Sequence, residues 1–96
     1  MALDKGSVKN AISEKSTEFI FKLKNGMEIA RANNLKDFVF RVKEIAAESL
    51  EYHTYNGHFG SWLRYFNRFE LAEKIDSLKS NGERLREDIL RIIGKI

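Results

Sequence analysis

The sequence contains no cysteine and no proline. Without cysteine, the chain forms no disulfide and offers no thiolate, either as a nucleophile or as a ligand for zinc. The lack of proline, together with many lysine and glutamate residues, is typical of a helical protein. No apolar run approaches the roughly 20 residues that a membrane helix needs, and the first residues do not resemble a signal peptide. We therefore expect a cytoplasmic protein that makes no contact with a membrane.

The composition is that of a small globular domain. Hydrophobic residues make up 43% and charged residues 32% of the 96 residues, a balance that excludes a disordered tail. Seventeen basic and 14 acidic residues leave a net charge of +3. Their signs alternate along the chain, as in Lys43-Glu44 and Glu83-Arg84. Interspersed charges predict a solvated surface, whereas dedicated nucleic-acid-binding proteins usually concentrate their basic residues on one face.

The chain is long enough for one hydrophobic core and too short for two. We divide it into a polar N-terminal arm or helix over residues 1–17 and a single helical domain over residues 18–96. The expected fold class is mostly α, a compact bundle of about five helices with short connections.

Residues 19–30 fit two different patterns. Phe19, Phe21 and Leu23 alternate as they would in a strand, and Asn25-Gly26 is typical of a hairpin turn. A two-residue loop at that turn, however, would mix apolar and charged side chains on each face. We therefore predict a helix here, with a short extended or hairpin piece as the alternative. The residues that carry the helical pattern are Phe19, Leu23, Met27 and Ala30.

From residue 33 onward the hydrophobic spacing predicts helices. The first covers about 34–45 and is capped by Asn33 or Asn34. A shorter helical segment begins at Ala46 and ends at Asn56-Gly57, where glycine supplies the positive φ of a helix terminus. Three further apolar stripes predict the remaining helices. They contain Phe59, Trp62, Leu63 and Phe66; Leu71, Ile75 and Leu78; and Leu85, Ile89, Ile92, Ile93 and Ile96.

The apolar stripe of the last helix is dense for a terminal helix. It either closes the core of the chain or meets a partner chain. The second alternative predicts a homodimer through this C-terminal helix, because a small helical domain gains buried surface by association.

The sequence offers few groups for catalysis. Its two histidines, His53 and His58, are five residues apart with a glycine between them, whereas two metal ligands on one helix need a spacing of four. No serine lies in a nucleophile elbow, and the glycines are too scattered for a phosphate-binding loop. We predict no metal, no cofactor and no catalytic residue. His53 is either a structural histidine, a ligand or partner contact, or, in an enzyme, a general acid or base beside a carboxylate.

Aromatic residues interleaved with arginine gather in the middle of the chain. They are Tyr52, Tyr55, Phe59, Trp62, Tyr65, Phe66 and Phe69. The spacing of Phe59, Trp62 and Phe66 fits one buried helix face, while the tyrosines are expected to keep their hydroxyl groups in water. Aromatic rings near arginine also stack on single-stranded bases or hold anionic ligands.

Two sets of candidate contact residues follow. For a small ligand or a protein partner they are His53, Trp62, Tyr65 and Arg68, with Phe69 completing a surface patch around the last two. For nucleic acid they are Arg64, Arg68, Arg84, Arg86 and Arg91.

Several short motifs recur in a known family. They are Phe19-x-x-x-Leu23-x-x-Gly26, Leu35-x-x-Phe38, Ser49-Leu50-x-Tyr52-His53, His58-Phe59-x-x-Trp62-Leu63 and Leu71-Ala72. Over about residues 19–76 the chain resembles the DUF5752-like family of small archaeal and bacterial domains of unknown function. The family more often has Asp where this chain has His58, so we expect Asn56 to cap the following helix instead. The resemblance implies no activity.

We therefore expect a non-enzymatic module that binds a protein or a small ligand. The alternative is a nucleic-acid-binding protein that uses arginine and lysine interleaved with aromatic residues.

Overall fold

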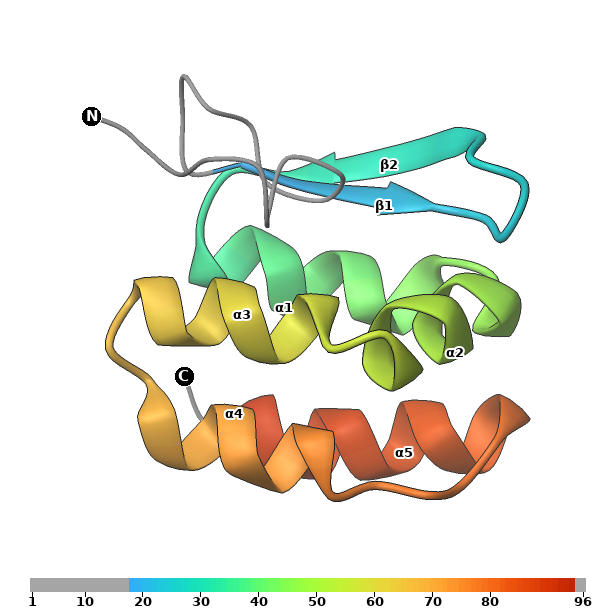
Figure 1. The fold of residues 1–96 in the computed structure, drawn as a ribbon. Helices are drawn as coiled ribbons and strands as arrows, with labels where there is room; N and C mark the ends of the chain where they lie inside the picture. The colour runs from blue at the N-terminus through green and yellow to red at the C-terminus, as the bar shows by residue number, and fades with distance from the viewer. Residues whose placement is uncertain (1–17, 95–96) are drawn as a thin grey trace.

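The computed structural model describes residues 18–94, and everything below concerns that part of the chain. Its elements are β1 (Phe19–Lys22), β2 (Glu28–Ala32), α1 (Leu35–Glu44), α2 (Ala47–Tyr55), α3 (His58–Tyr65), α4 (Phe69–Asp76) and α5 (Gly82–Ile93). Figure 1 shows three tiers, with the hairpin β1–β2 over α1, α2 and α3, and with α4 and α5 on the opposite side. The mostly α prediction is confirmed, with a small sheet added to the five helices. The predicted arm or helix over 1–17 lies outside the described residues.

The segment predicted as a helix is an antiparallel hairpin, so the helix prediction for residues 19–30 was wrong and the hairpin alternative was right. Phe19 pairs with Ala32 and Phe21 with Ala30, and these four side chains face the helices. The helical spacing of Phe19, Leu23 and Met27 does not reflect a helix. The buried residues of β1, Phe19 and Phe21, follow the two-residue period of a strand.

The hairpin avoids mixed faces in two ways. Its loop is longer than two residues, since the Leu23 N–H donates to the Met27 carbonyl at 2.9 Å and Gly26 takes a φ of +93°. The register also shifts after Phe21, so that Lys22 pairs with Glu28. The longer loop thus separates apolar from charged side chains next to the turn, and the bulge returns Phe19 and Phe21 to the partners that a two-residue loop would also have given them.

Helix side chains bind the outer edges of the hairpin. In an antiparallel ladder, backbone groups point alternately toward the partner strand and toward the edge. On β1, the Lys22 carbonyl accepts a hydrogen bond from Ser49 of α2 at 2.8 Å. On β2, the Arg31 carbonyl accepts one from Nε of Arg41, which lies on α1, at 3.0 Å. The hairpin is thus fixed to α1 and α2 by polar contacts as well as by its apolar face.

The predicted helices are present, and their ends follow the sequence signals in part. Asn34 caps α1, because its Oδ1 accepts from the Asp37 N–H at 2.8 Å. Asn56 does not cap α3, contrary to the prediction, and its side-chain amide donates instead to the Tyr52 carbonyl at 2.8 Å. Gly57, with φ +75°, occupies the N-cap position of α3 without a side-chain cap.

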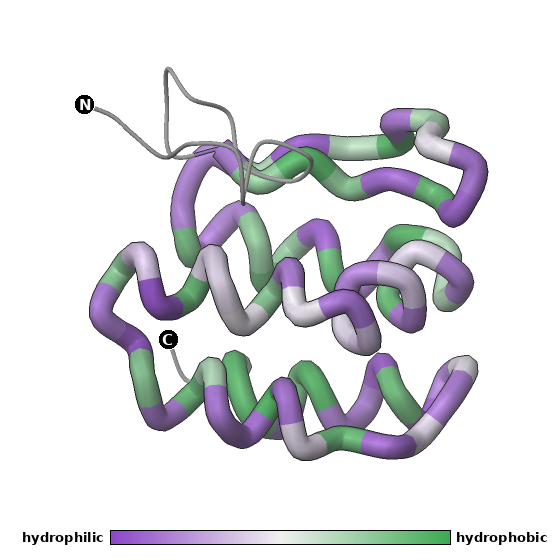
Figure 2. The backbone as a smooth tube through the Cα atoms, in the orientation of Figure 1, coloured by the Kyte–Doolittle hydropathy of each residue, from purple (hydrophilic) through white to green (hydrophobic). Residues whose placement is uncertain are grey.

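Aromatic rings from the hairpin, α1 and α3 form the centre of the core. Phe19, Phe38, Phe59 and Trp62 are fully buried, and the ring centroids of Phe38 and Trp62 lie 4.8 Å apart. Along the helices, hydrophobic and hydrophilic stretches alternate (Figure 2). The core therefore reaches from the hairpin through the middle tier.

The C-terminal helix completes this core. Leu85, Ile89 and Ile93 of α5 are fully buried against the rest of the chain. The apolar stripe that suggested a homodimer is therefore used within the chain itself. No helix within residues 18–94 is long and apolar enough to cross a membrane.

Candidate functional site

The four predicted contact residues fall into a buried pair and an exposed pair. His53 and Trp62 are fully buried, and both rings contact Phe19, at centroid distances of 4.9 and 5.6 Å. Tyr65 is 60% exposed and Arg68 is exposed. Trp62 is therefore a core residue that a partner cannot reach in this conformation.

His53 binds the backbone of β1 together with a serine on the same helix face. Its Nε2 accepts a hydrogen bond from the Lys22 N–H at 2.7 Å, and the Ser49 hydroxyl donates to the Lys22 carbonyl. Ser49 and His53 are four residues apart, so both project from one side of α2. Together, Ser49 and His53 satisfy both the N–H and the carbonyl of Lys22 at the edge of the hairpin. The sequence alone did not indicate this arrangement.

The other ring nitrogen of His53 meets His58, the first residue of α3. The two Nδ1 atoms are 3.0 Å apart, and the Tyr52 ring lies against both imidazoles, with centroid distances of 4.9 and 5.4 Å. A backbone N–H only donates, so Nε2 of neutral His53 has no proton and Nδ1 has one. His53 therefore donates to His58, whose own proton lies on Nε2.

Both histidines favour the neutral form. Burial lowers the pKa of His53 to about 3, with further lowering by the nearby His58 and Lys22. Burial and the charge of Lys22 also lower the pKa of His58, which is half-buried. With both nitrogens of His53 occupied, the structure gives no support to a general acid or base at this position.

Among the described residues, the histidine pair has no third side chain to complete a metal site. Within residues 18–94, no three His, Asp or Glu side chains are arranged to hold a metal ion. The proton on Nδ1 of His53 also occupies the lone pair that a metal would need.

The exposed pair lies at the corner between α3 and α4. Here Tyr65 and Phe69 are 60% and 56% exposed, and Arg68 lies between them in sequence. A Schellman motif ends α3 at this corner. The Arg68 N–H donates to the Leu63 carbonyl and the Asn67 N–H to the Arg64 carbonyl, both at 2.9 Å, and Asn67 has φ +63°.

The corner is backed by the core. Phe66 is half-buried, and its ring packs edge-on against Trp62 and Tyr65, at centroid distances of 4.9 and 5.4 Å. We call Tyr65, Arg68 and Phe69 the aromatic corner. Their exposure agrees with the surface patch predicted from the sequence.

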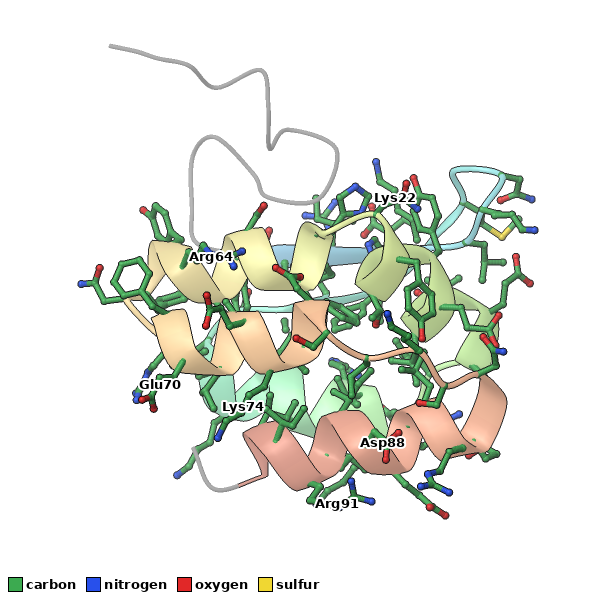
Figure 3. All side chains as sticks on the ribbon, turned by 60° about the horizontal axis from the view of Figure 1, so that its bottom comes forward. Lys22, Arg64, Glu70, Lys74, Asp88 and Arg91 are labelled. Carbon is green, nitrogen blue, oxygen red and sulfur yellow. The ribbon has the colours of Figure 1, made fainter. Side chains whose placement is uncertain are left out.

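The arginines proposed for nucleic acid are mostly paired with carboxylates. Arg64 contacts Asp76 at 3.0 Å, and Arg86 contacts Glu83 at 2.7 Å. Arg84 and Arg91 share the nearly buried Asp88, at 3.3 and 3.0 Å. Figure 3 shows Arg91 and Asp88 on α5, far from Arg64.

The carboxylate of Asp88 also accepts from the Ser80 hydroxyl at 2.6 Å. This hydrogen bond, with those from Arg91 and Arg84, holds the pKa of Asp88 below its usual value. Arg68 makes no ion pair with any residue between 18 and 94.

A shallow pocket of about 190 Å³ opens between the hairpin loop and α2. Its lining residues are Lys24, Glu48, Glu51, Tyr52 and Asn56. Each glutamate already accepts a backbone hydrogen bond, Glu48 from Lys24 at 3.4 Å and Glu51 from Gly82 at 2.8 Å. None of the four predicted contact residues lines this pocket.

Comparison with known proteins adds no relative. No family model matches the chain, and neither does any curated protein or any solved structure. The resemblance to the DUF5752-like family therefore stays a prediction based on the motifs given above.

Proposed function

We propose that this chain is a protein-interaction module and that the aromatic corner is its contact surface. The observation that supports this most directly is that two large aromatic side chains, Tyr65 and Phe69, are each more than half exposed beside an arginine. Tyrosine, phenylalanine and arginine are enriched in protein interfaces, and tyrosine and arginine are frequent among the residues that dominate binding energy.

The corner is also held in one shape before any partner arrives. Two Schellman hydrogen bonds fix its backbone, and the half-buried Phe66 anchors Tyr65 to the core. A preformed surface loses less conformational entropy on binding than a flexible loop does. Arg68 adds a charge that no carboxylate of residues 18–94 neutralises. The partner that fits this surface presents an apolar groove with a carboxylate at its rim.

The other candidate functions have weaker support. The pocket beside α2 is shallow, and its two carboxylates already accept hydrogen bonds from backbone N–H groups. For nucleic acid, four of the five proposed arginines pair with acidic side chains. We therefore test the nucleic-acid alternative as stacking of single-stranded bases on the aromatic corner.

A photocrosslinking experiment tests the proposal. A photoreactive phenylalanine analogue is placed at position 65 or 69, and at position 40 as a control. Phe40 lies on α1 and is 55% exposed, but the Arg41 guanidinium lies over its ring at 5.6 Å. We expect a discrete crosslinked protein from positions 65 and 69 in cell extract and none from position 40. Equal crosslinking from all three positions would contradict the proposal.

Two further measurements separate the partner classes. A second copy of the chain is identified by the mass of the crosslinked species and by concentration-dependent gel filtration. Nucleic acid is tested with labelled single-stranded oligonucleotides at low salt. Binding that weakens steeply with added salt and with Arg68→Ala would replace the protein-partner proposal by the nucleic-acid alternative.

A further inference from the structure

We infer that the His53–His58 contact is a pH-sensitive latch that joins the start of α3 to α2 and β1, and that one proton added to His58 opens it. The latch is a chain of two hydrogen bonds. It runs from the Lys22 N–H to Nε2 of His53, and from Nδ1 of His53 to Nδ1 of His58.

Only one arrangement of protons fits this chain while both rings are neutral. The Lys22 N–H requires a lone pair on Nε2 of His53, so the proton of His53 is on Nδ1. Nδ1 of His58 must then accept, which places the proton of His58 on Nε2. The backbone of β1 thereby determines the tautomers of two side chains on α2 and α3.

A second proton on His58 is incompatible with this arrangement. The imidazolium carries N–H groups at both nitrogens, so its Nδ1–H would face the Nδ1–H of His53 at 3.0 Å. His53 cannot accept this proton donor by changing tautomer, because its Nε2–H would then face the Lys22 N–H. The two histidines must therefore separate when His58 is protonated.

The separation occurs at His58 because the two rings differ in burial. His53 is fully buried among the rings of Phe19, Phe21 and Phe59, whereas His58 is half-buried and has a path to solvent. Once His58 has moved, Nδ1 of His53 is a buried donor without an acceptor. The open state therefore loses native stability.

The surrounding groups set the direction of the pH dependence. Lys22 of β1 is the charged side chain that acts on both imidazoles, and its positive charge opposes their protonation. Tyr52 of α2 is the other titratable side chain against both rings. Burial acts in the same direction as Lys22, so the latch stays closed at neutral pH and opens below the ordinary histidine pKa of 6.5.

Long-range ¹H–¹⁵N correlation spectra of the histidine rings test the closed state. At pH 7.5 we expect the Nδ1–H tautomer for His53 and the Nε2–H tautomer for His58. As the pH falls below 6.5, His58 should take up a proton before His53, which keeps its neutral spectrum. An Nδ1–H tautomer of His58 at pH 7.5, or protonation of His53 before His58, would overturn the inference.

Amide hydrogen exchange tests the opening. After correction for the intrinsic rate, the amides of residues 57–60 should exchange about tenfold faster at a pH where the ring spectra show His58 protonated than at pH 7.5, as the loss of one buried hydrogen bond predicts. His58→Asn supplies a matched control, because its Oδ1 accepts a hydrogen bond but does not titrate. We expect its exchange to be independent of pH in this range.

His58→Ala removes the acceptor and should show fast exchange of the same amides at both pH values. A pH response that persists in His58→Asn, or slow exchange in His58→Ala at pH 7.5, would show that the histidine contact is not the latch.

Discussion

Replacing Gly60 by alanine tests how closely α4 packs on α3. Gly60 is buried, and a Cβ atom at this position would lie 2.5 Å from Oδ1 and 2.7 Å from Oδ2 of Asp76, and 2.9 Å from Nη1 of Arg64. These atoms belong to the ion pair that joins the two helices, with a distance of 3.0 Å between Arg64 and Asp76. Carboxylate and guanidinium must both move if Gly60 becomes alanine.

The expected change in stability is the balance of three effects. Alanine favours the helical backbone over glycine by about 1 kcal/mol. Against this, the Asp76 carboxylate and the Arg64 guanidinium must swing aside, but both are ends of flexible, partly exposed side chains, so their displacement costs less than the roughly 1–3 kcal/mol of overpacking a closed core. Loss of the partly exposed ion pair adds at most about 1 kcal/mol. We therefore expect the gain in helix propensity to be cancelled in the wild-type chain, so that Gly60→Ala does not raise the free energy of unfolding and lowers it by at most about 1 kcal/mol.

A double-mutant cycle identifies the cause. In an Asp76→Ala background the carboxylate is gone, so Gly60→Ala should raise the free energy of unfolding by up to about 1 kcal/mol. Urea unfolding followed by circular dichroism measures all four proteins. If Gly60→Ala stabilises the wild-type chain as much as the Asp76→Ala chain, the close contact does not exist and the reasoning is refuted.

Three further predictions concern His53, Ser49 and the cap of α1. Since the pKa of His53 is lowered to about 3, the unfolded chain takes up the proton first, and stability falls as the pH falls below 6.5. From pH 7.5 to 4.5 this single group should lower the free energy of unfolding by about 3 kcal/mol, and urea titrations of His53→Gln should show a flatter profile. Ser49→Ala leaves the Lys22 carbonyl without its side-chain donor and should cost about 1–2 kcal/mol in the same assay, an expectation that an unchanged midpoint would contradict. Asn34→Ala removes the cap of α1 and should cost about 1 kcal/mol, whereas Asn34→Asp should keep most of the stability.

The helices were predictable because their apolar residues repeat at the helical period and several of their ends carry asparagine or glycine. The hairpin was predicted only as the alternative to a helix, for a specific reason. The sequence-based pairing assumed a two-residue loop, but the loop has one more residue and a bulge follows Phe21. Neither feature has a signal in the sequence strong enough to outweigh the spacing of Phe19, Leu23 and Met27.

Among the candidate contact residues, only exposure that depends on the helix period was predictable. Tyr65 and Phe69 fall outside the buried stripe of their helices, and both are exposed. The role of His53 was not predictable, because its partner is the backbone of Lys22, 31 residues earlier in the chain. Side-chain contacts with a distant backbone depend on how the hairpin docks, which no local pattern encodes.

The hydrogen bonds that α1 and α2 make to the hairpin edges also bear on how this protein behaves at high concentration. A two-stranded sheet has no interior strand, so each of its edges is a template on which another chain can add a strand. The carbonyls of Lys22 and Arg31 already accept hydrogen bonds from Ser49 and Arg41, so an incoming strand would have to displace these helix side chains before it could pair there. The same contacts that orient the hairpin therefore also oppose intermolecular strand addition and the aggregation that follows from it.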